Sequence, residues 1–470
     1  MIFLNVDKTK NTKYIYQQIY QALKKAITAN ELAENHKLPS KRTLAVQLQV
    51  SVNSVSTAYE QLLAEGYIYT IERKGYYVEK LNTFIHTQRP EEFPDNLRET
   101  PVHKDGWLSF SHMTSDVSMF PFKEWVKCQN KAIRNHKHEF SEIMNLQGPY
   151  LVRETIARMI ALTRGVVCEP EQIVIGGGTQ ALIRQFMTLQ DKNTKVAIEN
   201  PGYSRIHELL TSMKFDVASI SLDKKGIDIN EIHDANPNIL FITPSHQFPT
   251  GKIMPISRRI ELLNWAASAN DRYIVEDDYD SEFKYGTDNI PSLQSLDRNQ
   301  RVIYAGTFSK TLLPSLRISY IVLPPKLLKA YRKYFANWIQ ESNTFSLYTL
   351  HYFIKDGNYD RHIKRMTHHY ELKRKDLINK LKDIFGKEIV IEDIPAGLHF
   401  LAHFRTHRKY EEIHERAKKE KLEVYSIKRF TLKQLENHNH NNTISLVLGF
   451  ATIPPQDISE AVERLFRVIN

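Results

Sequence analysis

The chain has 470 residues, of which 41% are hydrophobic and 25% charged, and its mean hydropathy is −0.44. These ordinary globular values exclude a disordered or fibrous chain, and at roughly 100–200 residues per domain the length predicts about two to four domains. The 64 basic and 54 acidic residues leave a net charge of +10, which favours a nucleic-acid or anionic partner without proving one.

The chain carries no signal for a membrane, for secretion or for a metal. No uncharged apolar run approaches the roughly 18 residues that a bilayer crossing needs, and the N-terminus lacks a signal peptide's apolar stretch and cleavage site. Cys128 and Cys168 belong to no CxxC or Cys/His cluster, which argues against a disulfide scaffold and a metal site. We therefore expect a cytoplasmic protein with no membrane partner and no bound metal.

Residues 1–80 have the pattern of three helices followed by a hairpin. The first helix, over about 14–30, has an apolar residue at every fourth position, and Ser40 is the expected N-cap of the second. The third helix covers about 52–65, and the segment 67–78 predicts two strands around a basic tip. Three helices and a hairpin predict a winged helix-turn-helix.

In such a fold the start of the third helix reads base edges in the major groove, and basic residues bind phosphates. The candidate DNA-binding residues are Ser40, Lys41, Arg42, Asn53, Ser54, Thr57, Arg73 and Lys74. The alternative is a three-helix interaction module with a solvated charged surface, and the 11 basic against 7 acidic residues of 1–80 do not decide between them. The ordered combination of capped turn, polar helix face and basic wing favours DNA binding.

The stretch LPSKRTLAVQLQVSVNSVSTAYEQLLAEGYIYTIERKGYYV resembles the GntR-type winged helix. The resemblance covers nearly all of residues 12–80. One position departs from the family, because Val52 stands where the motif usually has arginine. The resemblance implies promoter DNA as a partner, and the departure leaves the effect of Val52 on DNA specificity open.

Beyond the first 80 residues the pattern changes twice. Residues 81–106 lose periodicity and contain three prolines, which predicts a linker. Residues 107–470 alternate helical stretches with short apolar strands, which we expect at 172–175, 195–198, 239–243, 273–276, 302–304 and 318–322. This alternation predicts an α/β domain with a parallel or mixed sheet, followed by a smaller C-terminal α/β lobe.

Three motifs in this domain point to one cofactor. A glycine run, Gly176 to Gly178, follows a strand and opens a helix, which suits a phosphate group, although a plain tight turn is an alternative. Lys310 follows another strand among hydroxyl residues, seven residues before Arg317, as an imine-forming lysine beside a phosphate-binding arginine would. By itself, such a lysine is usually a surface residue.

The third motif is Glu276-Asp277-Asp278-Tyr279 at the end of the strand 273–276. A carboxylate there can hold a pyridinium nitrogen protonated and a phenol can reach the 3-oxygen of the ring, whereas the alternative is an acidic helix N-cap. The order of phosphate loop, acidic strand end, lysine and arginine is much harder to obtain by chance than any one motif.

In this order the three motifs resemble the fold-type I aminotransferases, which bind pyridoxal 5'-phosphate. The motifs GPYLVR, NPGY and HQFPTG extend the resemblance from about residue 107 to the C-terminus. It implies that Lys310 forms the internal aldimine, that Asp277 holds the pyridinium, that Tyr279 binds the 3-oxygen and that Tyr203 stacks on the ring. The implied phosphate contacts are Gly178, Thr179, Ser309 and Arg317.

Two departures bear on activity. Phe248 replaces the asparagine that normally contacts the ring oxygen, and Val447 stands where aminotransferases carry the arginine for the substrate's α-carboxylate. A standard α-amino acid would therefore lose its bidentate clamp. Arg205 and Arg429 are candidates to hold an effector's carboxylate instead, although each could form a surface salt bridge.

A winged helix joined by a linker to an aminotransferase-like domain resembles the MocR subgroup of GntR regulators, in particular its γ-aminobutyrate-responsive members. This implies a head-to-tail homodimer that senses γ-aminobutyrate or a similar ω-amino acid by external aldimine formation, with little or no turnover, and controls γ-aminobutyrate utilisation genes. RNA polymerase is a further candidate partner. An active aminotransferase with a DNA-binding arm and a sensor of pyridoxal phosphate itself are the alternatives. The operator, the regulated genes and the sign of regulation stay open.

Overall fold

The computed structural model describes residues 14–81, 93–99, 105–112, 115–286, 290–433 and 442–470. The chain divides into two compact units, residues 1–102 and 103–470. Most of the expected linker lies outside the described residues, and its described part contains one 3-10 turn, Asp95–Leu97. None of the described helices combines the length and apolar character needed to cross a bilayer.

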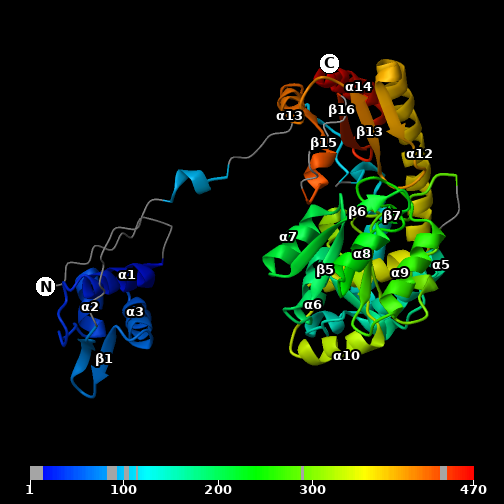
Figure 1. Ribbon diagram of the computed structural model, residues 1–470. Helices are drawn as coiled ribbons and strands as arrows, with labels where there is room; N and C mark the ends of the chain where they lie inside the picture. The colour runs from blue at the N-terminus through cyan, green and yellow to red at the C-terminus, as the bar shows by residue number, and fades with distance from the viewer. Residues whose placement is uncertain (1–13, 82–92, 100–104, 113–114, 287–289, 434–441) are drawn as a thin grey trace. The chain divides into compact units, whose positions relative to one another are not determined.

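The first unit contains the expected helices α1 (Ile15–Thr28), α2 (Lys41–Leu48) and α3 (Val52–Ala64), and the hairpin β1 (Ile68–Ile71) and β2 (Gly75–Val78), as Figure 1 shows. Ser40 and Ser51 cap α2 and α3, because each hydroxyl accepts the main-chain N–H of the residue three positions on. The three helices enclose one core, with Leu23, Leu44 and Tyr59 fully buried. The prediction of a winged helix-turn-helix is confirmed.

The second unit is built on an eight-stranded sheet. In spatial order its strands are β4 (Ile173–Gly176), β11 (Ser319–Val322), β10 (Val302–Thr307), β9 (Tyr273–Asp278), β8 (Ile239–Ile242), β5 (Lys195–Asn200), β6 (Asp216–Asp223) and β7 (Gly226–Ile227). All are parallel to one another except β11 and β7. The six expected strands all belong to this sheet, which confirms a mixed and mostly parallel arrangement.

Alternate residues of these strands enter cores on opposite faces of the sheet. Val174 packs with α6 (Thr179–Thr188) and α10 (Pro325–Tyr334), whereas Ile173 and Ile175 pack with helices of the other face. Helix α7 (Ser204–Ser212) lies on the face of α6 and α10. The helices of the other face are α4 (Phe122–Asn135), α5 (Tyr150–Arg164), α8 (Ile229–Ala235), α9 (Ile256–Ala267) and α11 (Thr344–Lys355). A strand covered on both faces is mostly apolar, which is why these strands were visible in the sequence.

The long helix α12 (Asn358–Phe385) leads into the smaller C-terminal lobe. An antiparallel sheet there has the order β12 (Ile389–Glu392), β13 (His399–Arg405), β16 (Thr443–Gly449) and β15 (Tyr425–Ser426). It packs with α12, α13 (Tyr410–Lys419) and α14 (Ile458–Ile469), as Figure 1 shows. The first strand of the unit, β3 (Leu108–Ser109), pairs with β14 (Leu422–Glu423), so the chain enters the unit through this lobe.

A buried ion pair joins α5 to the central sheet. Nε of Arg164 lies 2.7 Å from Oδ2 of Asp278, and both side chains are almost fully buried. The guanidinium also donates to the main-chain oxygen of Ile290, and the Tyr304 hydroxyl donates to the same carboxylate at 2.6 Å. Charges removed this far from water need all of these partners.

We expect Arg164→Leu to lower the free energy of unfolding by about 3–5 kcal/mol, because Asp278 would keep a buried charge without its cation. Arg158→Leu on the same helix is the matched control, since the Arg158–Glu154 pair is solvent-exposed and should contribute less than about 1 kcal/mol. All four tryptophans lie in residues 107–470, so tryptophan fluorescence during urea unfolding reports on this unit. Equal losses in the two variants would contradict the prediction.

Candidate functional site

The expected cofactor residues converge at one edge of the central sheet. The strands β4, β5, β8, β9 and β10 all end at this edge, because they run in the same direction. The loops that follow them carry Gly178, Tyr203, Phe248, Tyr279 and Lys310. In open α/β sheets, ligands bind beyond the carboxyl ends of the strands, so this edge is the candidate site.

Gly178 and Arg317 form an anion cradle at the start of α6. Gly178 has a φ of 133° and caps the helix without a side-chain hydrogen bond, which leaves the first main-chain N–H groups, from Thr179 onward, free to bind an anion. A Cβ on Gly178 would lie 2.1 Å from Nη2 of Arg317. In the described part of the chain this guanidinium forms no hydrogen bond or ion pair, so its charge is available for a phosphate.

Ser309 lies beside this cradle in a small network of hydroxyl groups. Its main-chain N–H donates to Oγ1 of Thr307 at 3.1 Å, and the Thr307 hydroxyl donates to Oγ of Ser309 at 3.0 Å. Ser319 donates to Oγ1 of Thr307 at 2.8 Å from the neighbouring strand β11. The network fixes the turn between β10 and Lys310.

Asp277 presents a carboxylate that has no partner for one of its oxygens. Its Oδ1 is buried and accepts no hydrogen bond in the described structure. Burial, together with the charges of Asp278, Asp280 and Glu199, raises the pKa of Asp277 to about 7. A buried cationic N–H donor would stabilise the ionised form, and a pyridinium nitrogen is such a donor.

Tyr279 is held by a buried histidine–aspartate pair that the sequence motifs contained but did not single out. Its hydroxyl donates to the main-chain oxygen of His246 at 2.9 Å and lies 3.1 Å from Nδ1 of the same residue. Nδ1 also lies 3.0 Å from Asp280. Burial raises the pKa of Tyr279 well above its usual value, so the phenol remains a neutral hydrogen-bond donor.

Lys310 points into the site with its amine held by a main-chain carbonyl. Nζ donates to the oxygen of His112, a residue that the motifs did not single out as functional. Burial lowers the pKa of Lys310 to about 8, an effect that Asp280 opposes and Arg205 reinforces. A lysine of this kind is partly unprotonated near neutral pH and can act as a nucleophile.

Arg205 and Arg429 lie on the same side of the site. The N–H of Gly202 donates to the main-chain oxygen of Phe430 at 2.9 Å, which joins the segment before Arg205 to the segment that carries Arg429. Both guanidiniums are exposed, and neither forms an ion pair with a carboxylate of the described residues. Their charges both act on the buried His112 and lower its pKa.

An apolar cluster also lines the site, next to the two arginines. Phe248, Leu401, Phe430 and Val447 form one buried cluster, with Tyr203 and Tyr279 packed against it. Val447 is fully buried in β16, so this wall offers no cation at the position where the sequence comparison expected an arginine. With Arg317 assigned to the phosphate cradle, the cations that we expect to meet a carboxylate entering the site are Arg205, Arg429 and Lys310.

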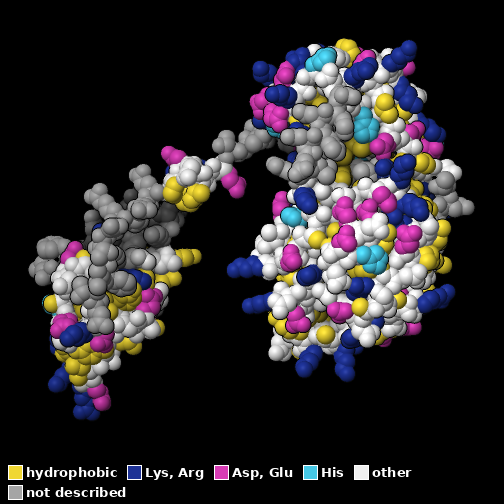
Figure 2. Space-filling view, in the orientation of Figure 1, with side chains coloured by type: hydrophobic (Ala, Val, Ile, Leu, Met, Phe, Trp, Pro, Cys, Tyr) yellow, Lys and Arg dark blue, Asp and Glu magenta, His cyan; other side chains and the backbone are white. Residues whose placement is uncertain are grey.

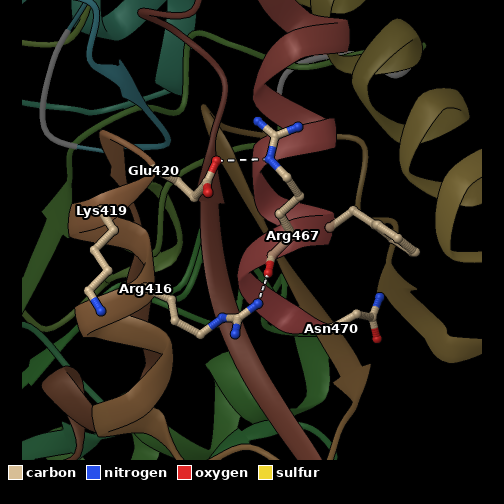
Figure 3. A pocket seen from close by; sticks show the side chains of 6 residues that line it. Arg416, Lys419, Glu420, Arg467 and Asn470 are labelled. Carbon is tan, nitrogen blue, oxygen red and sulfur yellow. Dashed lines mark hydrogen bonds and ion pairs between the residues drawn. The ribbon is translucent and has the colours of Figure 1, made fainter.

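A second pocket, between α13 and α14, is a weaker candidate. It has a volume of about 520 Å³ and is lined by Arg416, Lys419, Glu420, Phe466, Arg467 and Asn470 (Figure 3). Nε of Arg467 donates to Glu420 at 2.8 Å, and Arg416 donates to the main-chain oxygen of Arg467. Both arginines of this pocket are therefore already partnered.

Two family models match the chain: Bacterial regulatory proteins, gntR family, over residues 15–78, and Aminotransferase class I and II, over residues 107–465. The HTH-type transcriptional regulator YdeL of Bacillus subtilis (strain 168), itself uncharacterized, is 37% identical over 452 residues, which cover 96% of each chain. This chain belongs to the GntR-type transcriptional regulators that carry an aminotransferase domain. It is thus a DNA-binding regulator.

Two further similarities agree with this family. The probable rhizopine catabolism regulatory protein MocR of Rhizobium meliloti is 28% identical, over 96% of this chain and 93% of its own. The structure of Pyrococcus horikoshii kynurenine aminotransferase in complex with PMP has a TM-score of 0.68 at 21% identity, covering 77% of this chain and 90% of that chain. It shows the shared fold, and aminotransferase homologues of this fold bind pyridoxal phosphate or PMP.

In the GntR domain, the expected DNA-binding residues differ in solvent exposure and in the hydrogen bonds that their side chains form. Asn53 and Thr57 are exposed near the start of α3, and Arg42, Arg73 and Lys74 are exposed on α2 and the wing. Figure 2 shows basic side chains at the tip of this unit. Several side chains are hydrogen-bonded within the domain. Nζ of Lys41 donates to Ser56 and Glu60, the Thr57 hydroxyl donates to the main-chain oxygen of Asn53, and the hydroxyls of Ser40 and Ser54 take part in the two helix caps.

The pKa of Lys310 predicts its reactivity in the cofactor-free regulator. We expect labelling of Lys310 by trace acetic anhydride to rise with pH and to have its midpoint near pH 8, because the amine reacts only when unprotonated. Mass spectrometry of the digested protein measures the labelling, with the exposed Lys329 as internal standard. A midpoint near the ordinary lysine value of about 10.4 would contradict the lowered pKa.

Proposed function

We propose that this regulator binds pyridoxal phosphate and responds to an ω-amino acid, of which γ-aminobutyrate is the best candidate. The observation that carries the proposal is the placement of Arg205 and Arg429, two cations without carboxylate partners, beside the reactive Lys310. The stretches SFSHM, TPSHQFPTG, EDDYDSEF and GTFSKTLLPSLRISY also resemble GabR, the γ-aminobutyrate-responsive regulator.

The residues present fit pyridoxal phosphate. The orphaned Oδ1 of Asp277 matches the pyridinium N–H, and the cradle at Gly178 and Arg317 matches the phosphate. When bound, the cofactor supplies an aldehyde for which Nζ of Lys310 and the amine of an effector compete. Tyr203 lies against the edge of Phe248, with ring centroids 5.8 Å apart, and is the expected stacking partner.

The effector's two ends are recognised by different residues. Arg205 and Arg429 hold its carboxylate, while Lys310 and the main-chain oxygen of His112 mark the position of its amine. A guanidinium pair suits a carboxylate because its N–H groups match the geometry of the two oxygens. A carboxylate on the α-carbon would lie beside the amine, whereas the arginines favour one at the far end of the molecule.

The proposed output is a change in promoter binding. Effector binding would favour one of two arrangements of the lobe that carries Arg429, and a coupling of about 1–3 kcal/mol would change promoter affinity by several-fold to a hundredfold. Turnover is not required, and Phe248 in place of the asparagine expected of an active aminotransferase supports weak catalysis. RNA polymerase is a further proposed partner, and the site of action is the cytoplasm.

A homodimer is part of this proposal. A cavity of about 850 Å³ between α5, α11 and α12 is lined by charged residues and by the apolar residues Leu151, Met159, Leu162, Ile354 and Ile363. Leu162 is 88% exposed. Two further exposed apolar residues, Ile143 and Val167, are close to it in the sequence. Exposed apolar surface of this kind is typical of an interface, and a second copy is its proposed occupant.

Two alternative functions lead to different expected results. An aminotransferase with a DNA-binding arm would convert the effector steadily when an amino acceptor is supplied. A sensor of pyridoxal phosphate itself would not need a carboxylate clamp, so Arg205 and Arg429 argue against it. Product formation over hours, or promoter binding that responds to the cofactor alone, would favour these alternatives.

The clamp can be tested on the cofactor-loaded regulator. We expect Arg205→Ala and Arg429→Ala each to weaken γ-aminobutyrate binding about ten- to hundredfold, because each removes a charge-assisted contact with the carboxylate. Binding is followed by the absorption band of the bound cofactor, in parallel with promoter binding.

The controls separate the carboxylate from the amine. n-Butylamine, which lacks a carboxylate, should bind both variants as it binds the parent, and Lys428→Ala removes a neighbouring exposed charge that lies over the Tyr410 ring instead. If n-butylamine weakens as much as γ-aminobutyrate, the arginines do not hold the carboxylate. If γ-aminobutyrate leaves the band unchanged while other amines shift it, the effector is wrong.

The DNA contacts can be tested through salt dependence. Arg42→Ala and Arg73→Ala should each weaken binding to a DNA fragment selected by this protein, and each should reduce the slope of log K against log salt concentration by about 1. Lys25→Ala, an exposed charge at the end of α1, is the matched control and should leave the slope nearly unchanged. Equal slopes in all three variants would contradict the assignment of phosphate contacts.

A further inference from the structure

His112 has an imidazole with two unsatisfied nitrogens. The side chain is only 5% exposed, and neither Nδ1 nor Nε2 has a hydrogen-bond partner in the described structure. A neutral imidazole always carries one N–H donor and one acceptor nitrogen. Buried polar groups of native proteins are nearly always paired, so an orphan of this kind needs an explanation.

The neighbours of the ring explain its position but give its nitrogens no partner. Aromatic rings surround it, with centroid distances of 4.9 Å to Phe248, 5.3 Å to Phe430 and 5.5 Å to Tyr425. Phe248 belongs to the turn after β8, whereas Tyr425 and Phe430 belong to the C-terminal lobe. The ring is therefore held between the turn after β8 and the C-terminal lobe.

The charges that act on the pKa of His112 are all positive. Burial first, and then Lys310, Arg429 and Arg205, lower the pKa of His112 to about 3, so the imidazole is neutral at physiological pH. The N–H of a neutral ring cannot be satisfied by a Lys or Arg side chain, because those cations only donate hydrogen bonds, but it can donate to an anion. The anion that these surroundings favour is the one that Arg205 and Arg429 are proposed to hold.

We propose that the imidazole of His112 donates a hydrogen bond to the carboxylate of the ω-amino acid, as a third contact beside the two arginines. This inference rests on the proposed function. The main-chain oxygen of the same residue accepts a hydrogen bond from Nζ of Lys310, where the effector's amine is recognised. One residue thus contacts both ends of the effector, and the separation of its two polar groups selects the effector's length.

Substitution of the side chain separates the two ends, because the carbonyl that holds Lys310 remains. In the cofactor-loaded regulator, His112→Phe keeps an aromatic ring among its neighbours but removes the N–H, and should weaken γ-aminobutyrate binding about tenfold. His112→Gln restores a donor and should recover most of that loss. Cofactor affinity and n-butylamine binding should match the parent in both variants, which also shows that the site still folds.

Chain length gives a second readout. The parent should prefer γ-aminobutyrate over β-alanine and 5-aminovalerate, and His112→Phe should reduce this preference several-fold. If His112→Phe binds γ-aminobutyrate as the parent does while the arginine variants lose it, the role of His112 is wrong and the proposed function stands. Equal weakening of n-butylamine would overturn the role as well. If the parent responds to no ω-amino acid, the proposed function itself fails.

Discussion

The site depends on how strand β9 accommodates a row of acidic residues. Side chains alternate between the faces of a strand, so Glu276 and Asp278 share one face and Asp277 takes the other. Glu276 accepts the N–H groups of Leu293 and Gln294 at 2.7 and 2.9 Å, and Asp278 is held by Arg164. Asp277, on the other face, is left with an orphaned Oδ1 toward the cofactor site.

This division gives the site its electrostatic character. Burial raises the pKa of Glu276 to about 7 and that of Asp277 to about 7, and neighbouring carboxylates reinforce both shifts. On the opposite side of the site, Lys310 lies near Arg205 and its pKa is lowered to about 8. Of these groups, Asp277 and Lys310 belong to the cofactor site, and a ligand with a cationic ring and an aldehyde would provide a partner for each.

Much of this could be predicted from the sequence because the signals are local. Strands buried on both faces appear as apolar runs, and the loops at their carboxyl ends carried the lysine, aspartate and glycine motifs in a recognisable order. Strand β6 was missed because its burial is partial and its residues, DVASISLD, include many small polar ones.

Residues whose role depends on tertiary burial were not predicted. Glu199 ends up 3% exposed, with the N–H and hydroxyl of Thr243 donating to its carboxylate, and its charge raises the pKa of Asp277. Nothing in its local sequence distinguishes it from a surface glutamate. His112 was part of the similar stretch SFSHM, but its orphaned nitrogens became visible only when three separate segments were placed around it.

The position of His112 in the chain bears on how the two domains communicate. The segment that follows the expected linker forms β3, places Phe110 in the core and then reaches His112. It is hydrogen-bonded to β14, just before the lobe segment that carries Arg429, and it also holds Nζ of Lys310. In the proposed complex, the carboxylate and the amine of the effector would thus both lie next to His112, in the segment into which the linker leads.

Contacts alone do not make a switch, because an effector shifts an equilibrium only by its difference in affinity for the two states. The segment 105–112 would provide such a difference in affinity if its hydrogen bonds change between two states. In one state Nζ of Lys310 donates to the main-chain oxygen of His112, and in the other an effector occupies the site. By thermodynamic linkage the coupling is then reciprocal: whatever factor γ-aminobutyrate imposes on DNA affinity, DNA imposes on the affinity for γ-aminobutyrate. The regulator would therefore respond to effector over a concentration range set partly by its occupancy of DNA.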